Sequence, residues 1–291
     1  MAVRRENRRD ERCTDGVLAG FGKSAAPEGH HAAALRLDLF TRRLPMTVVL
    51  LDPYHLGDPL FVAQLARDVA ARASARGAGL PTEGLVFVHG SGEAGERALE
   101  ARGAFPEARG GVWAVASEDE AADVERATRD LNRRLVHEMN EAGVPAVRVM
   151  ASDRGLVARG PGGALRAGRT AWLATLAAQG GVAVVAALAA VEPGSGAALA
   201  EVDAAEAAAV IAEALGAAAV VLLATGRPAG APDDAQTVAD AAGRLPDRGL
   251  AERLVGCLGG GDGGGLRVPV VAAVVAQLRV PGAVSGTRLV A

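Results

Sequence analysis

The residues of this chain best suited to ligand chemistry are Gly90, Ser91 and Gly92, which directly follow the β-rich segment 85–88. Small side chains leave backbone N–H groups free to turn toward an anion, and the helix expected from Glu93 adds its positive end. Binding of a phosphate or a carboxylate is the chemistry that this loop would support. A tight strand-to-helix turn without a ligand is the alternative.

Three further polar side chains are candidates for chemistry, and each has a structural alternative. Asp203 stands before an expected helix, where it would position a ligand or Mg²⁺, or cap the helix. His89 would pack against or cap its loop, with acid–base chemistry as the alternative. His55, in the loop after the first expected strand, would donate to a phosphate when protonated or serve as an ordinary loop histidine.

A second phosphate-loop candidate, Gly22-Lys23-Ser24, fails on spacing. The position five residues before its glycine is Val17, where the motif requires another glycine. Lys23 is also the only lysine of the chain, so arginine supplies the other positive side chains. No lysine in the segment expected to fold is therefore present for catalysis.

The elements that must position these residues alternate between strand and helix patterns from residue 46 onward. Strands are expected at 47–51, 85–88, 144–149, 182–187, 219–223, 268–275 and 287–290, and helices at 58–76, 119–142, 171–179 and 204–215. This alternation predicts a three-layer αβα sandwich with a mainly parallel central sheet. Ligands in such sheets bind beyond the carboxyl ends of the strands, which is where the loop at 90–92 lies.

Composition narrows the class of protein. The net charge of −3 gives no basis for nucleic-acid or membrane-surface binding. Cys13 and Cys257 have neither disulfide nor metal-ligand spacing, which favours a cytoplasmic protein, and no metal ligands are assigned. The most apolar stretch is about half the roughly 20 residues of a membrane-spanning helix. Residues 1–45 are interpreted as a disordered tail or as the product of a misassigned start upstream of Met46.

The order and spacing of these features, over residues 46–291, resemble the amino-acid kinase family, and acetylglutamate kinases in particular. The most specific matches are Val-His-Gly-x-Gly at 88–92 and Gly-Thr-Arg-Leu at 286–289. Such enzymes move the γ-phosphoryl group of ATP onto a carboxylate, usually as homo-oligomers. The resemblance therefore implies an amino-acid kinase or carbamate kinase-like fold, MgATP, an acylated amino-acid substrate and a role in arginine-type biosynthesis.

The resemblance also assigns site residues and two lobes. Residues 46–168 would form the acyl-substrate lobe and 169–291 the nucleotide lobe. The implied substrate-binding residues are Gly90, Ser91, Gly92, Trp113 and Glu201; the implied nucleotide-binding residues are Thr225, Gly226 and Arg227. Asp203 is the candidate for a catalytic role.

Several positions depart from the family pattern. Leu50 stands where the family has a lysine, Trp113 where it has a substrate-binding arginine, and Ala205 where it has an aspartate that organises the catalytic lysines. Phosphoryl transfer depends on positive charge around the transferring oxygens. Two hypotheses remain open: arginines replace the lysines, or the chain is a catalytically inactive small-molecule-binding or regulatory subunit. The candidate arginines are Arg148, Arg154, Arg166, Arg169, Arg227 and Arg267.

Cations near Gly90–Gly92 would favour the enzyme, and an apolar cleft without cations would favour the binding protein. A nucleotide-binding oxidoreductase is a third hypothesis. The absence of Gly-x-Gly-x-x-Gly after any early strand disfavours it.

Overall fold

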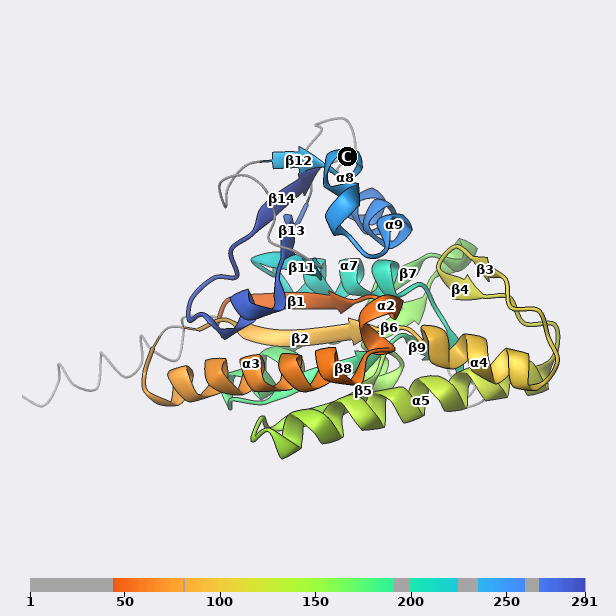
Figure 1. Ribbon diagram of the computed structural model, residues 1–291, viewed down its shortest axis with the longest axis horizontal. Coiled ribbons are helices and arrows are strands. Elements are labelled where there is room, and N and C mark those ends of the chain that lie inside the picture. The colour runs from red at the N-terminus through yellow and green to blue at the C-terminus, as the bar shows by residue number, and fades with distance from the viewer. Residues whose placement is uncertain (1–43, 81, 191–198, 225–234, 260–266, 291) are drawn as a thin grey trace, which may run out of the picture. The chain divides into compact units, whose positions relative to one another are not determined.

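The core of the structure is an eight-stranded sheet (Figure 1). The computed structural model describes residues 44–80, 82–190, 199–224, 235–259 and 267–290. In sheet order, the strands are β12 (Ala235–Thr237), β14 (Thr287–Val290), β13 (Val270–Ala273), β11 (Ala219–Leu223), β1 (Met46–Leu51), β2 (Gly84–His89), β8 (Val182–Ala186) and β5 (Ala146–Met150). Neighbouring strands are parallel except β13 and β14. The prediction of a mainly parallel sheet is confirmed.

Helices cover both faces of this sheet. Alternate residues of β1 point to opposite sides: Val48 and Leu50 pack in one apolar cluster, and Val49 and Leu51 in another. The first cluster includes side chains of α6 (Ala171–Ala178), α7 (Ala204–Leu215) and α9 (Arg248–Leu258). The second includes side chains of α3 (Pro59–Gly77) and α5 (Glu118–Glu141). Figure 1 shows α7 on the opposite side of β1 and β2 from α3 and α5, as the three-layer prediction requires.

The long helix α5 shows how the sequence sets the bounds of an element. The Ser117 hydroxyl accepts a hydrogen bond from the Glu120 N–H, and three acidic residues occupy the first turn, where they favour the helix dipole. The apolar stripe that includes Leu131, Leu135 and Met139 is buried against the sheet. Gly143, with φ of 85°, ends the helical run.

Short elements connect the main ones. They are the helices α2 (Pro53–Leu56), α4 (Glu93–Ala101) and α8 (Val238–Ala241), the 3₁₀ turns Asp153–Gly155, Pro161–Gly163, Ala242–Arg244 and Val275–Arg279, and three pairs of short antiparallel strands. These pairs are β3 (Ala108–Arg109) with β4 (Val112–Trp113), β6 (Val157–Arg159) with β7 (Leu165–Ala167), and β9 (Leu188–Ala190) with β10 (Leu199–Glu201). None of these short strand pairs is among the strands that the sequence pattern predicts.

Residues 43–291 form one compact unit. Residues 1–43, which include most of the expected disordered tail, lie outside the described residues. The division into two lobes at residue 168 stays a prediction. No helix within the described ranges is both long and apolar enough to cross a membrane.

Candidate functional site

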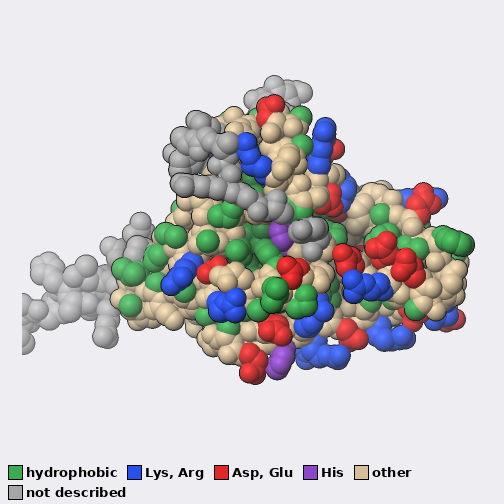
Figure 2. Space-filling view, in the orientation of Figure 1, with side chains coloured by type: hydrophobic (Ala, Val, Ile, Leu, Met, Phe, Trp, Pro, Cys, Tyr) green, Lys and Arg blue, Asp and Glu red, His purple; other side chains and the backbone are tan. Residues whose placement is uncertain are grey.

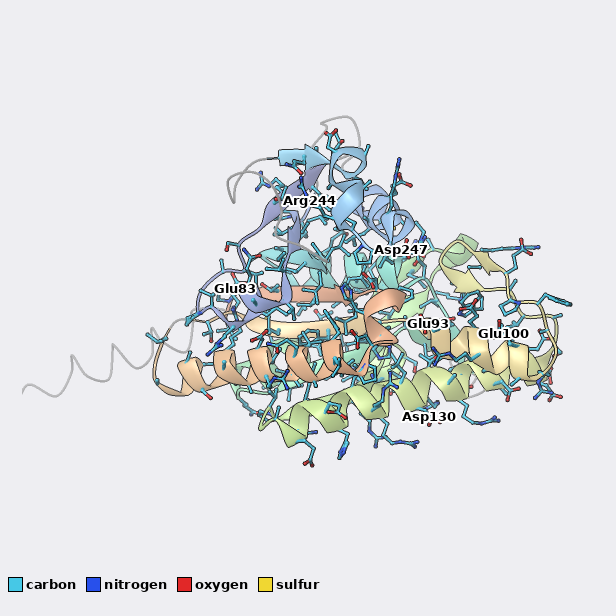
Figure 3. All side chains as sticks on the ribbon, viewed as in Figure 1. Glu83, Glu93, Glu100, Asp130, Arg244 and Asp247 are labelled. Carbon is cyan, nitrogen blue, oxygen red and sulfur yellow. The ribbon has the colours of Figure 1, made fainter. Side chains whose placement is uncertain are left out.

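The loop after β2 meets the loop after β1 at the carboxyl ends of these strands. Gly92 has φ of 53° and begins α4, and a Cβ atom there would lie 3.2 Å from the Cα of Pro53 in α2. Both the positive φ and this close approach require glycine. Glu93, the next residue, reaches toward α2, since a Cβ at Gly57 would lie 2.7 Å from its Oε2 (Figure 3).

The carboxylate of Glu201 occupies the loop that was expected to hold an anionic ligand. Glu201 is the last residue of β10, and its Oε1 accepts a hydrogen bond of 2.5 Å from the Ser91 N–H. A Cβ on Gly90 would lie 2.9 Å from the same oxygen, so Gly90 leaves the space that Glu201 fills. The structure thus brings Gly90, Ser91 and Glu201 together, and the Glu201 carboxylate accepts the hydrogen bond of the Ser91 amide.

Burial controls the electrostatics of Glu201. Loss of solvent raises the pKa of the Glu201 carboxyl, and the nearby Asp203 carboxylate raises it further; the Ser91 N–H and hydroxyl and the Trp113 backbone N–H act in the opposite direction. By hydrogen-bond geometry, Oε2 of Glu201 is buried and has no partner among the described residues.

Asp203 begins α7 two residues later. Its Oδ1 accepts a hydrogen bond of 3.1 Å from the Ala205 N–H, so the capping alternative is confirmed. Its Oδ2 lies 3.3 Å from Nε of Arg253 on α9. Burial raises the pKa of Asp203, and Arg253 partly offsets that effect. No group of three metal-ligating side chains occurs in the described part of the chain, so the Mg²⁺ alternative for Asp203 stays a prediction.

The β3–β4 hairpin covers this pair of carboxylates. A Cβ at Gly111 would lie 2.5 Å from Asp203 Oδ1 and 2.7 Å from Arg253 Nε. Trp113 donates from Nε1 to the Gly92 carbonyl oxygen at 3.1 Å, which ties the hairpin to the loop after β2. Trp113 therefore lies beside the loop, and its role in substrate binding stays a prediction.

His89 has a structural role at this loop. It is fully buried; its Nδ1 lies 2.8 Å from the Gly90 carbonyl oxygen, and its Nε2 lies 3.0 Å from Nδ2 of Asn132 on α5. The Asn132 amide also donates to the Val184 carbonyl at 2.9 Å. Burial lowers the pKa of His89 to about 4, so the ring is neutral at pH 7, donates through Nδ1–H and accepts at Nε2. The packing alternative explains this residue.

The end of β1 presents a carboxylate and an imidazole. Leu50 is buried in the core cluster between the sheet and α7. Asp52 is buried, caps α2 through the His55 N–H at 2.9 Å, and places its Oδ2 2.9 Å from His55 Nδ1. His55 stacks on Phe61, with ring centroids 4.1 Å apart. His55 is thus held within the folded loop, and the ordinary loop alternative accounts for it.

The arginines proposed as lysine substitutes that lie in the described ranges are not placed at the loop after β2. Arg148 lines a groove between β5 and α5, Arg154 lies over the Trp172 ring at 5.3 Å, and Arg267 pairs with Glu213 at 2.8 Å. Two further candidates are Arg166, which packs beside Gly160 in the β6–β7 hairpin, and Arg169, which is exposed. Arg227 lies outside the described residues, as do Thr225 and Gly226.

Arg253 is the cation that sequence reasoning missed. It belongs to α9 and meets Asp203 only because α7 and α9 pack together. No motif surrounds it in the sequence.

On the face of the molecule in Figure 2, arginine and carboxylate side chains are interspersed over α4 and α5, where several form ion pairs such as Arg102 with Asp123.

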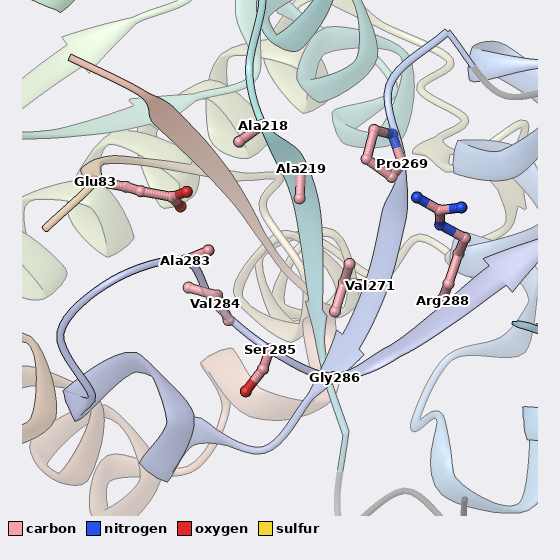
Figure 4. Close-up of a pocket in the computed structure, with 10 residues that line it drawn as sticks. All are labelled: Glu83, Ala218, Ala219, Pro269, Val271, Ala283, Val284, Ser285, Gly286 and Arg288. Atoms are coloured by element: carbon pink, nitrogen blue, oxygen red, sulfur yellow. The ribbon is translucent and has the colours of Figure 1, made fainter. Parts of the chain in front are cut away.

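A cavity of about 280 Å³ lies at the opposite ends of the strands (Figure 4). Its lining includes Glu83, which precedes β2, Ala219 at the start of β11, and Arg288 in β14. Glu83 and Glu93, both labelled in Figure 3, flank the two ends of β2. This cavity is therefore separate from the loop at Gly90–Gly92.

The mainly parallel sheet, with helices on both of its faces, defines an α/β protein. The chain belongs to the amino acid kinase family, because the model of the "Amino acid kinase family" matches residues 56–226. No curated protein matches this sequence.

Solved structures share the fold at low sequence identity. N-acetylglutamate synthase from Neisseria gonorrhoeae, complexed with coenzyme A and N-acetyl-glutamate, is 18% identical with a TM-score of 0.60 over 91% of this chain and 64% of the synthase. The smu.665 protein of Streptococcus mutans UA159 is 17% identical with a TM-score of 0.56, over 84% of this chain and 98% of that protein. An isopentenyl phosphate kinase is 16% identical with a TM-score of 0.53, over 84% and 99%. The chain thus spans under two thirds of the synthase, and the likeness establishes the fold.

Proposed function

We propose that this chain is a small-molecule-binding member of the amino acid kinase family that does not phosphorylate carboxylates. The observation that carries the proposal is the hydrogen bond from the Ser91 N–H to the Glu201 carboxylate. A substrate carboxylate or phosphate at Gly90–Gly92 needs that same amide. The protein's own acid therefore competes with an anionic substrate for it.

Charge strengthens this exclusion. Two like charges about 4 Å apart in a partly buried site repel by roughly 4 kcal/mol. A carboxylate substrate would meet Glu201 and, beyond it, Asp203, whose influence already raises the pKa of Glu201. Binding an anion would require Glu201 to move or to take up a proton.

Within the described ranges, the surroundings of the loop also lack the cations that phosphoryl transfer uses. Near the end of β1, the buried Leu50 stands where the family has a lysine, and Asp52 follows the strand. Arg253 approaches the loop, but Asp203 lies against its guanidinium at 3.3 Å. Stabilisation of the transferring oxygens depends on cations directed at them, and Arg253 is directed at a carboxylate instead.

The related synthase supports a ligand-binding use of this fold. Its structures were solved with coenzyme A together with N-acetyl-glutamate or L-arginine, and it is described as a synthase rather than a kinase. From the synthase we carry over to this chain only the proposal that the fold binds a small ligand. Nucleotide binding at Thr225, Gly226 and Arg227, ATP and Mg²⁺ as ligands, a homo-oligomeric state and a cytoplasmic location stay predictions from the family resemblance.

A second candidate function is ATP-dependent phosphorylation of the carboxylate of an acylated amino acid, as in acetylglutamate kinases. The observation that favours it is the position of Arg253 beside Asp203 and Gly111, near the loop. For this function, the substrate would have to displace Asp203 from Arg253 and Glu201 from Ser91.

An assay of phosphoryl transfer separates the two functions. The full chain is incubated with MgATP and N-acetyl-L-glutamate or L-aspartate, while ADP is quantified and acyl phosphate is trapped with hydroxylamine. We expect ADP at the level of the substrate-free control and no hydroxamate. Hydroxamate that depends on the carboxylate would overturn the proposal and establish the kinase.

A further inference from the structure

We infer that Glu201 and Asp203 recognise a small organic cation, an ammonium or guanidinium group, at the loop formed by Gly90, Ser91 and Gly92. This inference rests on the proposed function, because it names the class of ligand for the same site. It concerns the carboxylates themselves, which the fold brings together from β10 and the start of α7.

The unfilled hydrogen-bonding capacity of the site points to a donor. Glu201 Oε2 is a buried side-chain atom that has no partner among the described residues. A buried polar atom without a partner destabilises the folded protein, and more so when the atom is charged. An ionised carboxylate only accepts, so a ligand N–H satisfies Oε2 whereas a ligand carboxylate does not.

The charge balance of the site points to a positive ligand. Glu201 and Asp203 carry two carboxylates, and Arg253 neutralises one of them through its contact with Asp203. One negative charge remains when both acids are ionised. A ligand with one positive charge neutralises it, whereas an anion doubles it.

The donor set favours an organic cation over a metal ion. Hard divalent cations take six or more oxygen ligands. Across the described ranges, no cluster of three acidic, histidine or cysteine side chains is placed to hold a metal. An ammonium or a guanidinium group needs only a few acceptors and suits two carboxylates and a hydroxyl.

The β3–β4 hairpin is the element that such a ligand must displace to reach Oε2. Its strands contain two residues each, and it contacts the site through Gly111 at Asp203 and through the Trp113 backbone N–H at Glu201. Ala108 and Arg109 of β3 are exposed, whereas Val112 and Trp113 of β4 are half-buried, so β4 and the turn at Gly111 hold the hairpin to the site. A cationic ligand would then supply Oε2 with a charged donor.

Calorimetric titration of the full chain tests this inference. The probes are n-butylguanidinium and n-butylammonium as cations and N-acetyl-L-glutamate as the anion. We expect saturable binding of at least one cation and none of the anion. Glu201→Gln keeps the shape and an acceptor for the Ser91 N–H, and it should weaken cation binding by about tenfold or more, since a neutral amide binds a cation less strongly than a carboxylate does. Asp203→Asn retains the helix cap and should also weaken binding.

A matched variant removes the same charge elsewhere. Glu141→Gln, at the exposed end of α5, should bind the cations as the unmodified chain does. The inference is overturned if neither cation binds, if Glu201→Gln binds them unchanged, or if the anion binds in preference. Carboxylate-dependent ADP formation is a separate result: it would refute the proposed function while leaving cation recognition to be judged by the titration.

Discussion

The Ser91 N–H donates a hydrogen bond to Glu201 Oε1 across 110 residues of sequence. This contact joins the loop after β2 to the end of β10, and it places a carboxylate where the family resemblance predicts a bound substrate. Both the proposed function and the proposed ligand class depend on it.

Removing the charge of Glu201 should stabilise the fold. Burial raises the pKa of the Glu201 carboxyl above its unfolded value, so the unfolded chain releases this proton more readily and stability falls as pH rises through that range. Glu201→Gln should therefore unfold at a higher temperature than the unmodified chain at pH 8, by about 1–2 kcal/mol in free energy of unfolding. The difference should shrink toward pH 4. Thermal unfolding with Glu141→Gln as the control measures it; a lower melting temperature for Glu201→Gln at pH 8 would argue against a strained buried charge.

The affinity of the site for a cation should depend on pH, and Glu201 should be the residue that causes this dependence. The groups that face Glu201 are Asp203, which itself faces Arg253, and the Ser91 and Trp113 amides. A cation favours the ionised carboxyl, so its affinity should rise with pH through the raised pKa, with release of a proton on binding. Titrations in two buffers of different ionisation enthalpy detect that proton. Equal heats in both buffers near that pKa would contradict this prediction.

The buried histidine should make the fold sensitive to acid. His89 has a pKa lowered to about 4 against an ordinary value near 6.5, so the unfolded state gains a proton first as pH falls. Stability present above pH 6.5 should be lost between about 6.5 and 4, amounting to about 3 kcal/mol for a shift of this size. His89→Gln should flatten the pH dependence of denaturant unfolding in that window. The same substitution at the exposed His137 should leave it unchanged; an unaltered profile for His89→Gln would count against the neutral buried ring.

The hairpin supplies a matched pair of glycine variants. Gly110 and Gly111 both have positive φ, of 57° and 79°, but a Cβ at Gly110 meets open space whereas one at Gly111 would lie 2.5 Å from Asp203 Oδ1. Each alanine substitution carries the strain of a positive φ, about 1 kcal/mol. Only Gly111→Ala should also disturb Asp203 and Arg253, and so change cation affinity in calorimetry. Equal affinities for the two variants would show that the hairpin does not contact the site in solution.

The sequence was sufficient to predict the layers of the fold. Long apolar periods predict α5 and the central strands, because burial on both faces of a parallel sheet demands Val, Leu and Ala. The hairpins β3–β4 and β9–β10 escaped prediction since two- and three-residue strands are too short to show a period. Their positions depend on tertiary contacts, such as that of Gly111 with Asp203.

The sequence located the loop of the candidate site, but not the contacts made there. The family resemblance assigned Gly90, Ser91, Gly92, Trp113 and Glu201 to substrate binding, which stays a prediction; the structure shows that Gly90 and Ser91 contact Glu201. The hydrogen bond from the Ser91 N–H to Glu201 could not be predicted from the sequence, because it depends on the direction of the Glu201 side chain at the end of β10. Arg253 could not be found either, since its contact with Asp203 arises from the packing of α7 on α9.

The central claim is that the Glu201 carboxylate keeps other carboxylates away from the Ser91 amide. Titration of N-acetyl-L-glutamate into the unmodified chain, into Glu201→Ala and into Glu141→Ala tests it most directly. We predict no saturable binding to the unmodified chain or to Glu141→Ala, and binding to Glu201→Ala, in which the amide is free and the repelling charge is gone. Binding of N-acetyl-L-glutamate to the unmodified chain that is as tight as its binding to Glu201→Ala would contradict the account.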